Sequence, residues 1–137
     1  EKPIRTTLEL VDIIRSAMPA AALREKQHPA KRSFQAIRIA VNDELGSVEK
    51  AMEVAIPLLN PGGRLAIITF HSLEDRMVKN IIRTGNIEGK NETDIFGHNH
   101  APLKAVHRGV ITPSEEELTA NPRSRSAKLR IAEKAND

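Results

Sequence analysis

The chain has no cysteine, tryptophan or tyrosine, and its only aromatic residues are three phenylalanines. Without cysteine there are no disulfides and no thiolate metal sites, which fits a cytoplasmic protein. With so few aromatic rings, we do not expect a base-stacking platform for single-stranded nucleic acid. No stretch approaches the roughly 18 consecutive apolar residues that a membrane-spanning helix needs, so we expect no membrane partner.

A Gly-rich loop of the kind that binds phosphates or dinucleotides is also missing from the 137 residues. The chain opens with Glu1-Lys2-Pro3, which is neither an initiator methionine nor the start of a signal peptide. We therefore expect it to begin inside a longer protein. Its length is nevertheless sufficient for one domain with a hydrophobic core.

Positive charge gathers in two segments, although the net charge is only +3. One segment is residues 1–38 and the other is the tail from Asn121. The cations that stand out are Lys31, Arg32, Arg38, Arg123, Arg125 and Lys128. Clusters of this kind can neutralise the phosphates of RNA, and the alternative is an ordinary solvated surface.

The spacing of apolar residues predicts an α/β domain. Helices are expected at about 7–18, 31–45, 48–59, 73–83 and 113–120, and strands at 64–70, 103–110 and 127–132. Thr6 and Glu9 are expected to form a capping box at the start of the first helix. Gly46 is expected to end the second helix, and Ser47, Ser72 and Thr112 to cap the three helices that follow. Residues 84–102 have no periodicity, which predicts a surface loop.

Two of the predicted strands differ in pattern. Residues 64–70 are apolar without alternation, which predicts burial on both faces in a parallel sheet. In residues 127–132, Leu129 and Ile131 alternate with Lys128 and Arg130, as in a strand whose charged face is solvated.

The most informative polar cluster follows the strand at 64–70. His71, Ser72 and Asp75 stand where that strand ends, and ligands of open α/β sheets bind at the carboxyl ends of parallel strands. Ser72, Glu74 and Asp75 also suit a plain helix N-terminus, which leaves His71 unexplained. Ser72 is a poor candidate nucleophile because no G-x-S-x-G turn surrounds it.

A metal site could be imagined from the remaining histidines. His98, His100 and His107 lie in or near the predicted loop together with Asp94. No supporting carboxylate occurs at a fixed spacing, so we predict no metal site. A hydrolase that uses His71 and a carboxylate is a further alternative. We do not favour it, because the chain has no oxyanion or nucleophile motif.

Four motifs in order resemble the bacterial small-subunit ribosomal RNA cytosine-N4-methyltransferases (the RsmH, formerly MraW, type), and they cover most of the chain outside residues 84–102. They are His28-Pro29-Ala30-Lys31-Arg32-Ser33-Phe34-Gln35-Ala36-Ile37-Arg38-Ile39, Val41-Asn42-Asp43-Glu44-Leu45, Pro61-Gly62-Gly63 with residues 64–76, and Pro113-Ser114-Glu115-Glu116-Glu117 with residues 121–130.

This resemblance implies the C-terminal half of a Rossmann-like class I methyltransferase sheet together with part of an inserted helical subdomain. Residues 1–46 would end the insertion, and residues 47–137 would complete the methyltransferase domain. The family uses S-adenosylmethionine to methylate the exocyclic N4 of a cytidine in small-subunit rRNA. Its Gly-rich loop and its acidic ribose contact precede the matched region, so no cofactor-binding residue is expected in this chain.

The resemblance also assigns roles. His71, Ser72 and Asp75 are candidates to line the target pocket, with Asn42 a weaker one, and the six cations are candidates to hold RNA. The chain alone is expected to be inactive. The alternative is a non-enzymatic RNA-binding or interaction module. A missing half-sheet would expose the edge of strand 64–70, and we expect homodimerisation, exchange of elements or poor stability as a result.

Overall fold

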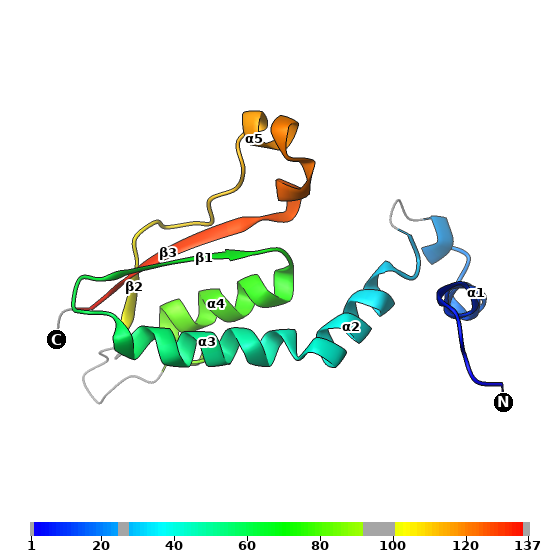
Figure 1. Cartoon of the computed structure of the whole chain (residues 1–137), viewed down its shortest axis with the longest axis horizontal. Coiled ribbons are helices and arrows are strands. Elements are labelled where there is room, and N and C mark those ends of the chain that lie inside the picture. The colour runs from blue at the N-terminus through cyan, green and yellow to red at the C-terminus, as the bar shows by residue number, and fades with distance from the viewer. Residues whose placement is uncertain (1, 25–27, 92–100, 136–137) are drawn as a thin grey trace. The chain divides into compact units, whose positions relative to one another are not determined.

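The computed structural model describes residues 2–24, 28–91 and 101–135. The chain divides into two compact units, residues 1–44 and residues 45–137. Figure 1 shows the elements of each unit in order along the chain. Among the described residues, no helix is both long and apolar enough to cross a membrane.

The first unit contains α1 (Thr7–Ala17), a short 3-10 helix (Ala22–Arg24) and α2 (Lys31–Asn42). The predicted capping box at the start of α1 is confirmed. Thr6 Oγ1 accepts from the backbone N–H of Glu9 at 3.2 Å, and the Glu9 carboxylate accepts from the N–H of Thr6 at 3.1 Å. Ala30, at the start of α2, is the one buried residue among those described in this unit.

The prediction that Gly46 ends the second helix was wrong. The break falls at Asp43, which adopts a left-handed conformation with φ of 48° and whose N–H donates to the carbonyl of Ile39. An aspartate tolerates this conformation better than most residues because its short polar side chain can bond locally. Gly46 and Ser47 then lie inside α3 (Glu44–Leu58), so Ser47 is not a cap.

The second unit is built on a small antiparallel sheet. Its strands are β1 (Arg64–Thr69), β2 (Leu103–Ala105) and β3 (Lys128–Lys134), in the order β1-β3-β2. Since β1 and β2 both run antiparallel to β3, they are parallel to each other. In the described sheet β3 is the central strand and β2 is an edge strand. The α/β fold class is confirmed.

Helices α3 and α4 (Ser72–Thr84) lie on one side of this sheet (Figure 1). The buried core is contributed by both helices and by β2 and β3. Its members are Met52, Val78, Ile81, Ile82, Leu103 and Ala132. Leu65 and Ile67 of β1 pack against it, whereas Ile68 and Phe70 are 59% and 56% exposed. Burial of β1 on both faces, predicted from its apolar sequence, is therefore wrong for the described chain.

The prediction that the charged face of β3 is solvated was also wrong. Residues directly opposite each other in an antiparallel pair share a face. Arg130 lies opposite Ile67, which packs against the core beneath α3 and α4, whereas Leu129 lies opposite the exposed Ile68. The charges of β3 thus face the helices rather than bulk solvent, because α4 supplies an acidic partner described below.

The link between α3 and β1 is held from β3. At Gly62, whose φ is 76°, the backbone N–H donates to the carbonyl of Lys134. The Lys134 ammonium donates to the carbonyls of Pro57 and Leu59 at 3.3 and 2.8 Å. These carbonyls belong to the end of α3, where a cation also complements the helix dipole.

The remaining helix of this unit is α5 (Glu115–Ala120), followed by a 3-10 helix (Pro122–Ser126). Its N-cap is Ser114, whose hydroxyl accepts from the N–H of Glu117 at 3.2 Å, so the prediction of Thr112 as the cap was wrong. Residues 85–91 form hydrogen-bonded turns at the end of α4. For example, the Asn80 amide donates to the carbonyl of Ile87 at 2.8 Å.

Candidate functional site

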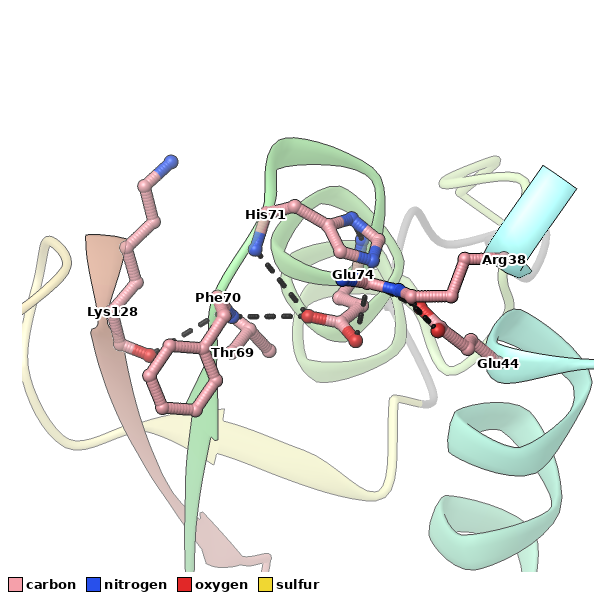
Figure 2. Close-up of polar contacts among 7 residues, drawn as sticks. All are labelled: Arg38, Glu44, Thr69, Phe70, His71, Glu74 and Lys128. Carbon is pink, nitrogen blue, oxygen red and sulfur yellow. Dashed lines mark hydrogen bonds and ion pairs between the residues drawn. The ribbon is translucent and has the colours of Figure 1, made fainter. Parts of the chain in front are cut away.

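The junction between β1 and α4 carries the polar cluster that the sequence singled out. Glu74 Oε2 accepts from the backbone N–H groups of Phe70 at 3.0 Å and of His71 at 3.4 Å. In return, His71 Nδ1 accepts from the N–H of Glu74 at 3.3 Å. Figure 2 shows this reciprocal arrangement, which is a capping box with histidine in the cap position.

The second ring nitrogen of His71 faces the same glutamate. Nε2 lies 3.3 Å from Glu74 Oε1, and the imidazole is 8% exposed. Because Nδ1 can accept only when it carries no proton, the arrangement fits the tautomer protonated at Nε2. The ring is thereby fixed against the first turn of α4.

These contacts correct the assignment of the cap. Ser72 is the first residue of α4 rather than the residue that caps it. His71 therefore acquires a structural role that the sequence left unexplained. Ser72 is exposed, and its hydroxyl makes no hydrogen bond within the described part of the chain.

Asp75, one turn into α4, is held by the tail strand. Arg130 donates to it twice, from Nε to Oδ1 at 2.8 Å and from a terminal nitrogen to Oδ2 at 3.0 Å. The Lys128 ammonium lies 3.8 Å from Oδ2. The two partners are largely shielded, with side chains 13% exposed for Asp75 and 16% for Arg130.

This environment stabilises the ionised carboxylate. The hydrogen bonds from Arg130 lower the pKa of Asp75 below its ordinary value of 3.8, against an opposing effect of burial, and Lys128 and Lys79 lower it further by their charge. Asp75 is thus a fixed anion with both oxygens engaged by a guanidinium. Arg130 was not predicted as its partner, since no local pattern connects residues so distant in sequence.

The predicted RNA-contacting cations have three different environments. Lys31 and Arg32 are exposed at the start of α2, and Arg123 and Arg125 are exposed in the 3-10 helix after α5. Arg38 instead forms a two-pronged ion pair with Glu44, with distances of 2.6 and 3.1 Å. Lys128 is half-buried beside Asp75.

The imagined histidine metal site is not assembled by the described residues. Asp94, His98 and His100 lie outside them. His107 is described, and its Nδ1 accepts from the N–H of Gly109 at 3.3 Å. Asn42, the weaker candidate for the target pocket, is exposed at the end of α2.

Several polar groups at the end of β1 are already engaged within the protein. A cofactor carboxylate or ribose would need free backbone N–H groups or a free acid there. The N–H groups of Phe70, His71 and Glu74 are used within the capping box, and Asp75 is used by Arg130. These groups are therefore not available to a cofactor.

The chain is similar to proteins of one family. A family model described as the MraW methylase family matches residues 1–135. The chain is 53% identical over 137 residues to Ribosomal RNA small subunit methyltransferase H of Heliobacterium mobile, a match that covers 98% of this chain and 44% of that protein. It is 54% identical over 131 residues to the protein of the same name from Bacteroides thetaiotaomicron, covering 96% and 42%. The chain thus spans less than half the length of these curated relatives.

Proposed function

Since the chain belongs to the MraW methylase family, we propose that it forms part of an S-adenosylmethionine-dependent enzyme that methylates the exocyclic N4 of a cytidine in small-subunit rRNA. The observation that carries this proposal is the identity of about half the residues, over nearly the whole chain, with proteins named for methylating that RNA. The enzyme would act in the cytoplasm, where ribosomal subunits are assembled.

The cofactor would be bound by parts of the enzyme other than the described residues. The N–H groups of Phe70, His71 and Glu74 and the carboxylate of Asp75 are already used within the protein. When bound, S-adenosylmethionine supplies an electrophilic methyl group. The chain by itself is then expected neither to bind the cofactor nor to transfer a methyl group.

We assign two different roles to the three candidate target-pocket residues. Cytosine N4 is a weak nucleophile because its lone pair is delocalised into the ring, so the enzyme must accept hydrogen bonds from the amine and orient it. The exposed hydroxyl of Ser72 is available for such a contact. His71 and Asp75 already use their polar atoms within the protein, so we assign them to positioning the strand–helix junction.

The exposed cations are proposed to bind the phosphates of the rRNA substrate. Lys31, Arg32, Arg123 and Arg125 are accessible and make no ion pair within the described residues. Arg38 and Lys128 would contribute less, because each already faces a carboxylate. Their partner would be small-subunit rRNA, free or within a ribosomal subunit.

We also propose that the isolated chain self-associates through β1. In the sheet formed by the described residues, β1 is an edge strand, and the exposed side chains of Ile68 and Phe70 lie beside that edge. Unpaired strand edges flanked by apolar side chains are prone to pair with another chain.

The experiment that tests the proposed function uses a longer protein carrying these residues together with an upstream Gly-rich loop. Transfer of a labelled methyl group to the N4 of a cytidine in purified small subunits or their rRNA is expected, and Ser72→Ala should lower its rate. Calorimetric titration of the 137-residue chain with S-adenosylmethionine is the companion measurement, with no binding expected. RNA binding by the longer protein without methyl transfer would instead favour the non-enzymatic RNA-binding module.

A further inference from the structure

A cavity of about 410 Å³ opens at the β2 edge of the second unit. It lies between α4, β2 and the turn that follows β2, with part of β3 forming one wall. Its cationic lining consists of Lys79, Arg83, Lys104, Arg108 and Arg130. No carboxylate is among the described residues that line it.

Not all of these cations are already compensated. Arg130 is paired with Asp75, and Arg83 donates to the carbonyl of Gly89 at 3.2 Å. Lys79, Lys104 and Arg108 form no ion pair with any residue that the structure describes. The described residues of the lining therefore carry a surplus of positive charge. Charges that line a concave low-dielectric surface attract an anion more strongly than scattered surface charges do.

Part of the cavity lining is apolar. Ile82, Leu103 and Ala105 contribute to this part, and His107 also lines the cavity. Because His107 Nδ1 already accepts from Gly109, the orientation of this ring is fixed at the wall. A ligand that suits these surfaces combines a phosphate with a flat, weakly polar body, which is the composition of a nucleotide.

We propose that this cavity binds a nucleotide of the RNA substrate, with its phosphate held by Lys79, Lys104 and Arg108 and its ribose or base against Ile82 and Leu103. The proposal rests on the proposed function, because that function supplies RNA as the ligand. It assigns a second RNA contact, separate from the exposed cations of α2 and of the 3-10 helix. The residues come from distant parts of the chain, so the sequence alone did not indicate the site.

The experiment measures binding of a short, fluorescently labelled single-stranded RNA to the 137-residue chain at several salt concentrations. The variant Lys104→Gln with Arg108→Gln removes two uncompensated cations of the cavity. Its matched control, Lys2→Gln with Lys90→Gln, removes the same charge from exposed positions outside the cavity that form no ion pair among the described residues. Circular dichroism of all proteins verifies that the variants remain folded.

The cavity variant is expected to bind the RNA about tenfold more weakly than the control. The slope of log K against log salt should become smaller by about 1.4, which is roughly 0.7 for each of the two lost phosphate contacts. Equal affinities of the two variants would overturn the proposal. A competition experiment with polyglutamate could also overturn the proposal. If polyglutamate displaces the RNA from the wild type but not from the cavity variant, and the wild type does not prefer RNA to polyglutamate, the partner of the cavity is an acidic protein.

Free cytidine monophosphate distinguishes a mononucleotide site from an RNA site. An RNA site should bind it far more weakly than the RNA strand, and tighter binding of the free nucleotide would overturn the proposal. The methyl-transfer assay in the longer protein separates the two hypotheses. Loss of RNA affinity in the cavity variant without any methyl transfer by the longer wild-type protein would contradict the proposed function alone, whereas methyl transfer with unchanged RNA affinity would contradict the cavity alone.

Discussion

Asp75 of α4 and Arg130 of β3, 55 positions apart in the sequence, are joined by two hydrogen bonds of 2.8 and 3.0 Å. Both side chains are largely shielded from water. The pair fixes the first turn of α4 against the strand that runs beside β1. It therefore holds the strand–helix junction that carries His71 and Ser72 in place.

Replacement of Asp75 by Asn should destabilise the fold at neutral pH. The change leaves the guanidinium of Arg130 without its anion in a partly buried position, so the free energy of unfolding should fall by about 1–3 kcal/mol. Urea unfolding of the wild type and the variant measures this difference. A double-mutant cycle with Arg130→Gln isolates the pair, and an absent coupling energy would contradict its structural role.

The same comparison predicts a pH dependence. Because folding lowers the pKa of Asp75 below its ordinary value of 3.8, the stabilisation should be complete above that value. This stabilisation should be lost progressively as the pH falls from 3.8 to below the lower pKa that Asp75 has in the folded state. The stability of Asp75→Asn should not show this component, and a wild-type minus variant difference that persists in strong acid would contradict the assignment.

Replacement of His71 by Ala should remove the cap of α4. The loss of one accepted hydrogen bond at the helix start is expected to lower the free energy of unfolding by about 1 kcal/mol. Asn, a good cap with no titratable ring, should restore most of it. In the longer enzyme His71→Asn should also restore methyl transfer; restored stability without restored activity would instead indicate direct contact with the substrate.

Replacement of Arg32 by Gln should weaken RNA binding more than replacement of Arg38 by Gln. Both variants lose one charge from α2, but Arg38 is already neutralised by Glu44 whereas Arg32 is exposed. Loss of a phosphate contact should lower the salt slope of binding by about 0.7 for Arg32→Gln and by less for Arg38→Gln. Equal effects would show that net charge alone governs the interaction.

Replacement of Ile68 by Lys should reduce self-association of the isolated chain. A charge beside the outer edge of β1 disfavours pairing with a second edge, and the side chain is exposed, so the fold itself should tolerate the change. Sedimentation velocity at several concentrations measures the effect. Lys50→Gln, outside the sheet, serves as the control, and a wild-type chain that stays monomeric would contradict the proposal.

The sequence by itself determined the local elements and the family. The Thr6–Glu9 capping box and the position of β1 followed from patterns within a few residues, because helix caps and buried strands are local features. Where two local solutions competed, the prediction failed. Gly46 and Thr112 were reasonable helix boundaries, yet Asp43 and Ser114 occupy these positions in the structure.

Only the tertiary structure decided what the polar residues do. The alternation of Lys128 and Arg130 with Leu129 shows that β3 has two different faces, but not which face meets a helix. That choice depends on Asp75 arriving from α4 to compensate the charges. The cationic cavity was hidden for the same reason, since its residues come together only when α4, β2 and β3 pack, and packing joins residues whose distance along the chain carries no information about their contact.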